Sequence, residues 1–122
     1  MDEITRLQSE VLKVLAQPTR LEILHHLADG PIEVGRLAAA VGVTQPNVSQ
    51  HLAVLRTAGL VEPDRHGREI RYRLTDPDVL RACDVMRTVL RRRLERLAAL
   101  ATMPDDARGA DPRRVFQLLA RS

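Results

Sequence analysis

The feature that most constrains the fold of this chain is a glycine between two segments whose apolar residues recur at helical spacing. In residues 32–42, apolar side chains recur at three- and four-residue spacing, which predicts a short helix with one inner face. Gly42 supplies a turn, and Thr44 is a natural N-cap for a following helix. Pro46 takes the second helical position, where its missing N–H has no partner to lose. The stretch therefore predicts two helices joined by a tight turn, which is a helix-turn-helix.

The helix after the turn has an apolar face and a polar face. It is expected to end near Ala58, and its inner face to consist of Val48, Leu52, Leu55 and Ala58. In a helix-turn-helix the second helix lies in the major groove of DNA, where its N-terminal residues meet base edges. Amides can pair with adenine, hydroxyls can bind a base or a phosphate, and the helix N-terminus adds N–H donors for phosphate. The side chains that fit this role are Thr44, Gln45, Asn47, Ser49, Gln50 and Arg56.

A change of hydrophobic period follows this helix. Residues 69–74 alternate apolar and charged side chains, which predicts a half-buried strand. Residues 61–65 are its expected partner, with His66 and Gly67 as the turn. The hairpin would form a basic wing, because it carries Arg65, His66, Arg68, Arg71 and Arg73. The polar helix surface alone could be merely solvated, but a second basic element beside it favours DNA binding.

Two amphipathic helices are expected before this unit. Residues 2–16 repeat apolar side chains at helical spacing. The second helix begins at Pro18, which suits a first turn, or at a capping box formed by Thr19 and Glu22, and it stops at Gly30. Its apolar stripe is expected to be Leu21, Leu24, Leu27 and Ala28.

A long helix, residues 77–101, is expected after the hairpin. Three apolar residues in it lie seven apart, and others fill in beside them. The stripe is Cys83, Met86, Leu90, Leu94, Leu97 and Leu100. It is too long for a small domain to cover alone, which predicts a helix–helix dimer interface. Arg93 interrupts the stripe, so a regular coiled coil is not expected throughout.

The chain is expected to hold one domain and a tail. Residues 1–101 would form the DNA-binding and dimerisation domain, which a chain of 122 residues is long enough to fold. Residues 102–122 begin as a linker, "TMPDDARGADP", and end in "RRVFQLLARS", which is either a short helix or a frayed tail.

The amino-acid composition favours some classes of binding partner over others. All but one of its 19 basic residues are arginine, whose planar fork suits phosphate and guanine, although a GC-rich genome would give the same bias. The two aromatic residues, Tyr72 and Phe116, are too few for base stacking, so duplex DNA is favoured over single strands or RNA. No membrane span or signal peptide is expected, and a single cysteine fits a reducing cytoplasm.

Three motifs in this order resemble the ArsR/SmtB family of winged helix-turn-helix repressors. They are "LAQPTRLEILHHL", "VSQHLAVLRTAGLV" and "RHGREIRYRL", and the resemblance covers about residues 8–97. It implies a mainly α fold with a small β-hairpin, dimerising through the first and last helices. It also implies a homodimer bound to an inverted-repeat operator and released by an inducer. By position, the base-contacting residues would be Gln45, Ser49 and Gln50, with Arg65 and Arg68 at the wing tip.

The chain departs from the family's metal-sensing members. Some carry cysteines in the third helix, where this chain has Glu33 and Gly35. Others place metal ligands on the last helix, where this chain pairs two aspartates with a valine and an arginine, at Asp76, Asp78, Val89 and Arg92. Two carboxylates opposite an arginine do not make a plausible zinc site, so no metal and no cofactor are expected.

Two residues have competing interpretations. His51 lies in the DNA-reading helix and is expected to be a structural or phosphate-side residue rather than a metal ligand. Cys83 is either a small apolar residue of the dimer stripe or a redox sensor. A sensor would need an accessible sulfur whose thiol pKa is lowered by Arg81 and Arg87.

The function predicted is that of a sequence-specific duplex-DNA-binding regulator, a dimeric repressor released by a signal that the sequence does not identify. The alternative is a winged-helix module that binds proteins and not DNA. An enzyme is not expected, because no phosphate-binding glycine loop, metal-ligand cluster or nucleophile–base pair is present.

Overall fold

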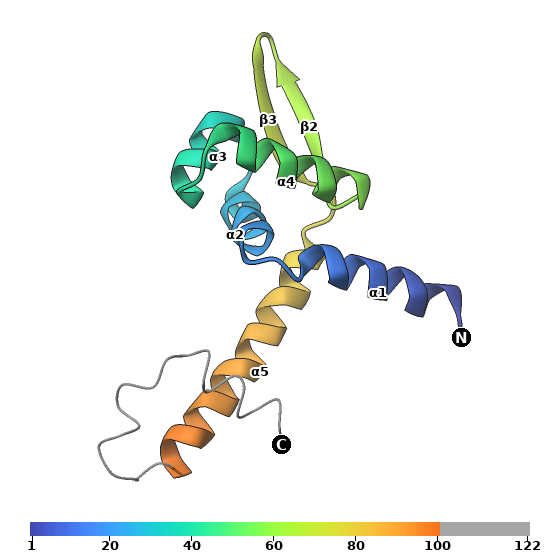
Figure 1. The fold of residues 1–122 in the computed structure, drawn as a ribbon, viewed down its shortest axis with the longest axis vertical. Helices are drawn as coiled ribbons and strands as arrows, with labels where there is room; N and C mark the ends of the chain where they lie inside the picture. Colours follow the sequence, from blue (N-terminus) through green and yellow to red (C-terminus); the bar gives the residue numbers. More distant parts are fainter. Residues whose placement is uncertain (101–122) are drawn as a thin grey trace. The chain divides into compact units, whose positions relative to one another are not determined.

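The computed structural model describes residues 1–100 (Figure 1). In chain order its elements are α1 (Glu3–Leu15), α2 (Pro18–His26), a 3-10 turn η1 (Leu27–Asp29), β1 (Ile32–Glu33), α3 (Val34–Val41), α4 (Gln45–Thr57), β2 (Val61–His66), β3 (Glu69–Leu74) and α5 (Asp78–Leu100). They fall into two compact units, one of residues 1–81 and one that begins at Ala82. The predicted linker and terminal helix, residues 102–122, lie outside the described residues.

The turn between α3 and α4 forms as the sequence predicts. Gly42 ends α3 with a φ of 82°, a left-handed conformation that favours glycine. Thr44 caps α4 by accepting a hydrogen bond from the Asn47 N–H at 3.2 Å. Pro46 occupies the first turn. These three residues fix where the second helix of the helix-turn-helix begins.

The second helix of the chain begins at Pro18 and not at the capping box. Gln17 is its N-cap, and its amide oxygen accepts from the Thr19 N–H at 2.8 Å and the Arg20 N–H at 3.3 Å. The expected apolar stripe is partly wrong, because Ala28 is exposed in the 3-10 turn. Ile23 is fully buried instead.

The sheet has three strands where the sequence predicts two. The added strand, Ile32–Glu33, pairs antiparallel with β3, so the order is β1-β3-β2. Two residues are too few to show an alternating pattern, and the sequence therefore assigns them to the following helix. The hairpin turn is Gly67–Arg68, since His66 is the last residue of β2 and pairs with Glu69. Gly67 alone has positive φ there, the pattern of a type II′ turn.

The core of the first unit lies where α2, α3 and α4 meet the base of the hairpin. Of the four residues predicted to face inward, Val48, Leu52 and Leu55 are at most 1% exposed, whereas Ala58 directly follows α4 and is half-buried. The other residues buried there are Leu15, Ile23, Leu24, Leu27, Val34, Leu37, Ala38, Leu60, Val61 and Leu80. From this core the β2–β3 hairpin projects beyond α4 as a wing (Figure 1). The unit is a winged helix-turn-helix.

The part of α5 that belongs to the second unit buries little. No residue from 82 to 100 is buried. Of the predicted stripe, Met86 is 54%, Leu94 44% and Leu100 75% exposed. Cys83 and its heptad relatives Leu90 and Leu97 are half-buried. Among residues 1–100, no helix combines the length and the apolar character needed to cross a membrane.

Candidate nucleic-acid interface

The N-terminal half of α4 and the wing form two walls of one groove. The groove has a volume of about 290 Å³, and its lining includes Gln45, Ser49 and Arg68 as well as the carboxylates of Glu33 and Glu69. Gln45 and Ser49 are four residues apart, so their side chains leave the helix within about 40° of each other. Arg68 comes from the hairpin turn. The fold therefore brings an amide, a hydroxyl and a guanidinium from distant parts of the sequence to one exposed place.

The other predicted reading residues are not gathered at this groove. Asn47 leaves α4 about 160° around the helix from Ser49. Gln50 lies about 160° from the buried Val48 and thus faces away from the core. Arg56 is on the same side as Ser49 but about 10 Å further along the helix axis. The side chains of Asn47, Gln50 and Arg56 are all exposed.

The backbone at the start of α4 offers fewer donors than the sequence suggests. A helix N-terminus normally presents several unpaired N–H groups to an anion. Here Pro46 has no N–H, and the Asn47 N–H is bonded to the Thr44 hydroxyl oxygen. The expectation of a strong phosphate site on the helix end is therefore weakened, and side chains must supply most donors.

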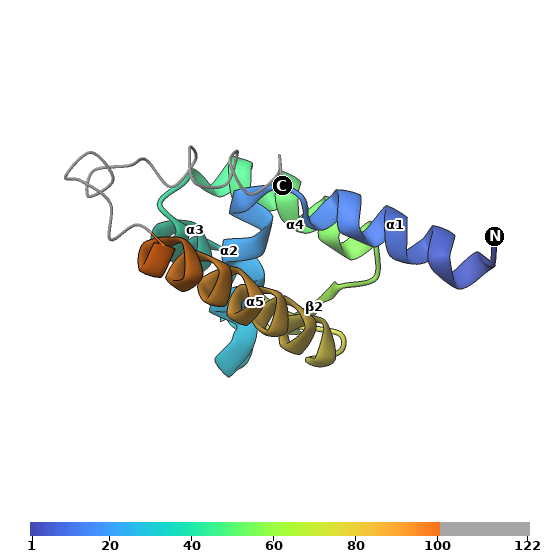
Figure 2. The ribbon, with the colours of Figure 1, turned by 90° about the horizontal axis from the view of Figure 1, so that it is seen from below.

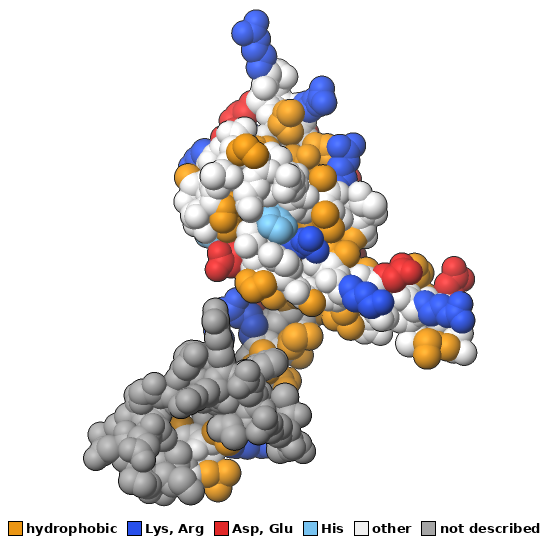
Figure 3. All heavy atoms as spheres, viewed as in Figure 1, with side chains coloured by type: hydrophobic (Ala, Val, Ile, Leu, Met, Phe, Trp, Pro, Cys, Tyr) orange, Lys and Arg blue, Asp and Glu red, His pale blue; other side chains and the backbone are white. Residues whose placement is uncertain are grey.

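Basic residues of the wing divide into two groups. Three bond acidic neighbours within the hairpin, as Arg71–Glu69 at 3.0 Å, Arg73–Glu62 at 2.8 Å and His66–Asp64 at 3.1 Å. Arg65 and Arg68 have no acidic partner among residues 1–100. Figure 3 shows basic side chains at the projecting end of the hairpin. The positive charge free to meet a phosphate is thus concentrated near the turn and not spread along the strands.

His51 belongs to a hydrogen-bonded group on the other flank of α4. Its Nδ1 accepts from the Arg20 Nε at 3.2 Å, and the Arg20 Nη1 also donates to the Val14 carbonyl at 3.0 Å. Desolvation first, and then the charge of Arg20, lower the pKa of the His51 imidazole. Sequence reasoning missed Arg20, because 31 residues separate it from His51 and no local spacing connects them.

Two of the acidic residues compared above with the family's metal ligands, Glu33 and Asp76, accept hydrogen bonds from backbone N–H groups near helix starts. Glu33 is the N-cap of α3, and its carboxylate accepts from the Gly35 N–H at 2.9 Å and the Arg36 N–H at 3.1 Å. These two bonds lower the pKa of Glu33. Asp76 accepts from the Asp78 N–H at 2.9 Å, and Asp78 pairs with Arg81 at 3.1 Å. Within residues 1–100, no group of three or more His, Cys, Asp or Glu is placed to hold a metal ion.

The surroundings of Cys83 disfavour the reactive thiolate form. Partial burial, and then the charge of Asp84, raise the pKa of the Cys83 thiol. This direction is opposite to the lowering of the Cys83 pKa by Arg81 and Arg87 that a redox sensor would need. One of those arginines, Arg81, is engaged by Asp78. A half-buried thiol with a raised pKa matches the interpretation of Cys83 as a small side chain in an apolar stripe.

Known proteins share this fold and these motifs. A family model described as "Bacterial regulatory protein, arsR family" matches residues 17–63, which run from the N-cap of α2 to Pro63 in β2. The HTH-type transcriptional regulator CmtR of Mycobacterium bovis is 49% identical over 70 residues, which is 57% of this chain and 59% of that protein. The chain thus matches less than two thirds of the length of CmtR.

One further relative and one solved structure are similar to a larger part of this chain. The biofilm growth-associated repressor of Xylella fastidiosa is 37% identical over 66% of this chain and 71% of its own length. A homodimeric winged helix-turn-helix DNA-binding domain from Mycobacterium bovis, Mb0332, superposes with a TM-score of 0.70 at 34% identity over 76% of this chain and 86% of its own. From its motifs, its fold and these relatives, the chain belongs to the ArsR family of bacterial regulatory proteins.

Proposed function

We propose that this protein is a transcriptional repressor that binds duplex DNA in a sequence-specific manner as a homodimer. The observation that carries the proposal is the groove at which Gln45 and Ser49 of α4 meet Arg68 of the wing. An amide and a hydroxyl can read base edges in the major groove, and a guanidinium can bind a phosphate beside them. A site with these two chemistries side by side suits DNA better than it suits a general docking surface.

The relatives support the same conclusion. CmtR is named a transcriptional regulator, the Xylella protein a repressor, and the Mb0332 domain a homodimeric DNA-binding domain. For this chain, the apolar stripe of α5 offers a surface for a second copy. A two-fold dimer would place two α4 helices on an inverted repeat, one in each half-site.

The remaining residues that we propose as DNA contacts have supporting roles. Thr44 sets the start of α4, Gln50 faces outward, and Asn47 and Arg56 lie beyond the groove. On the wing, Arg65 is free for a phosphate, whereas His66 first has to leave Asp64. We expect Gln45, Ser49, Gln50 and Arg68 to dominate.

Selection from a pool of random duplexes tests the proposal. The wild-type protein should enrich an inverted repeat, and its affinity should fall steeply with salt because phosphate contacts release counterions. Gln45→Ala and Gln50→Ala should each lose discrimination at one base position of each half-site, by about 1–3 kcal/mol. No enriched sequence, together with no salt-dependent binding, would overturn the proposal in favour of a protein-interaction module.

Two wing arginines provide a matched pair for this test. Arg68→Ala should weaken binding to all sequences alike and reduce the salt slope by about one. Arg73→Ala is the control, because Arg73 is already paired with Glu62 and should affect affinity little. Equal effects of the two substitutions would show that the wing acts only through its net charge.

A further inference from the structure

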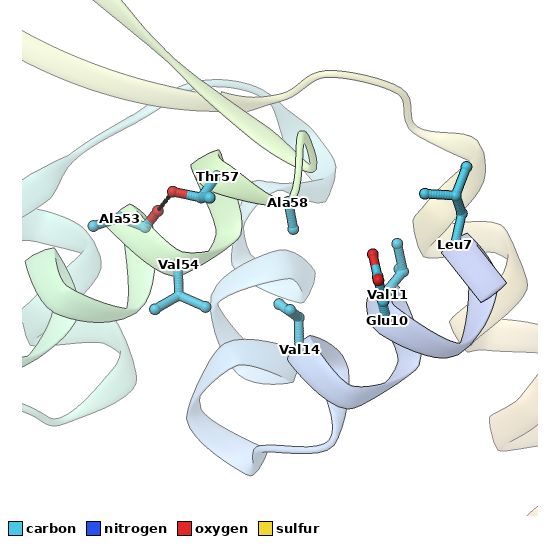
Figure 4. A pocket seen from close by; sticks show the side chains of 8 residues that line it. All are labelled: Leu7, Glu10, Val11, Val14, Ala53, Val54, Thr57 and Ala58. Atoms are coloured by element: carbon cyan, nitrogen blue, oxygen red, sulfur yellow. Dashed lines mark hydrogen bonds between the residues drawn. The ribbon is translucent and has the colours of Figure 1, made fainter.

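Helix α1 lies beside the C-terminal half of α4 without filling the space between them. The two helices enclose an open groove of about 560 Å³. Figure 4 shows that the groove is lined by the side chains of Leu7, Val11 and Val14 on α1, by that of Val54 on α4 and by that of Ala58, which directly follows α4. Figure 2 shows the same two helices side by side from another direction. Because the groove is open, apolar packing alone fixes the direction of α1 only loosely.

A polar bridge ties the two helices at the end of this groove. Arg20 extends from the first turn of α2 and donates through Nη1 to the carbonyl of Val14, near the end of α1. Such a carbonyl has no partner within its own helix. The Nε of the same guanidinium donates to Nδ1 of His51, on α4. One planar group therefore holds a helix end and a side chain of the reading helix in a fixed relation.

His51 is suited to accept this bond. A neutral imidazole accepts at one nitrogen and donates at the other, so acceptance at Nδ1 places its proton on Nε2. Burial and Arg20 both favour the neutral ring. His51 directly follows Gln50 on α4. A shift at this residue would consequently move the proposed reading surface.

We infer that Arg20 is a positioning residue that sets the angle between α1 and the reading helix, and hence the spacing of the two reading helices in the dimer. The inference rests on the proposed function, and it adds α1 to the dimer interface because the apolar side chains of Ile4 and Leu12 on α1 are 73% and 46% exposed. Arg20 acts through Val14 and His51 and does not itself read bases. Its loss should therefore alter the preferred distance between half-sites while leaving the preferred sequence of each half-site unchanged.

The test compares Arg20→Lys, which keeps the charge but lacks the planar guanidinium that donates through both Nε and Nη1, with the wild-type protein. Affinities are measured for duplexes with one half-site and for inverted repeats whose spacing varies by single base pairs. We expect the preference for the best spacing to fall roughly tenfold, the size of effect that losing hydrogen bonds to a charged group produces. Affinity for the single half-site should stay as in the wild type. Arg36→Lys is the control, since Arg36 is an exposed arginine of the same unit outside this bridge.

Substitutions of His51 make the test independent of any one variant. His51→Asn keeps an acceptor near the position of Nδ1 and should retain the spacing preference, whereas His51→Leu should lose it as Arg20→Lys does. The imidazole nitrogen shifts of wild-type His51 should report a proton on Nε2. An unchanged spacing preference in Arg20→Lys and His51→Leu, or an equal loss on single half-sites, would overturn the inference. Failure of the wild-type protein to bind any duplex would instead overturn the proposed function.

Discussion

Helices α4 and α5 are both amphipathic, yet their apolar faces are buried to different extents. In the 13-residue α4, Val48, Leu52 and Leu55 are all buried against the same unit. In the 23-residue α5, only Leu80, near its start, is buried. The polar face of α4 is thus backed by a closed core, which holds the side chains that we propose as DNA contacts in place. The apolar face of α5 has no such cover among residues 1–100, and this difference favours a second copy as its partner.

The largest expected effect comes from removing an anchor of α4. Leu52→Ala should lower the free energy of unfolding by about 2–5 kcal/mol, because it leaves a cavity in a closed core. The matched change Leu94→Ala on α5 should cost less than about 1 kcal/mol in monomeric protein, since Leu94 is 44% exposed. Denaturant unfolding at low protein concentration measures both. Equal losses would mean that the two faces do not differ as described.

The second effect concerns self-association. Met86→Asp places a charge in the apolar stripe of α5 and should raise the dimer dissociation constant at least tenfold, or about 1.4 kcal/mol. Thr88→Asp places the same charge about 160° around the helix and should leave association unchanged. Sedimentation at a series of concentrations distinguishes the two variants. Dimers of the Met86→Asp protein with wild-type affinity would show that this stripe is not the interface.

A smaller loss is expected at the start of α4. Thr44→Ala removes the cap and should cost about 0.5–2 kcal/mol of stability, and Thr44→Ser should restore most of it. Affinity for DNA should fall with the alanine variant and return with the serine variant. If both variants unfold like the wild type, Thr44 contributes nothing as a cap.

The smallest effect is the pH dependence contributed by His51. The pKa of His51 is lower in the folded protein than its ordinary value of about 6.5, so the unfolded chain takes up the proton first as the pH falls. Stability should therefore decline as the pH drops below about 6.5 and level off below the folded pKa. Unfolding of the wild type and His51→Asn between pH 7.5 and 5 isolates this contribution. A wild-type advantage that grows on acidification would contradict the assigned direction.

Much of the fold could be predicted from local signals. Gly42, Thr44 and Pro46 mark the turn and the start of α4 because each acts on the backbone within a few residues. The two-residue strand at Ile32 could not be predicted, since its only signal is pairing with β3 far along the chain. The exact hairpin turn depends in the same way on register, which places His66 opposite Glu69.

The site could be predicted in part. The identities of Gln45, Ser49 and Arg68 could be read from the sequence, but their meeting at one groove depends on tertiary structure. The sequence does not show that Arg71 and Arg73 are paired. Their ion pairs with Glu69 and Glu62 become visible only in the structure of the hairpin. The bond from Arg20 to His51 likewise joins residues that no spacing rule connects.

We propose that the groove between α4 and the wing reads duplex DNA. Titration of nitrogen-15-labelled protein with the selected inverted repeat, followed by amide chemical shifts, tests it most directly. We expect the largest changes at Gln45, Ser49 and Arg68, and much smaller ones with a scrambled duplex of equal length. Shifts that leave these three residues unchanged while the selected duplex is bound would contradict it.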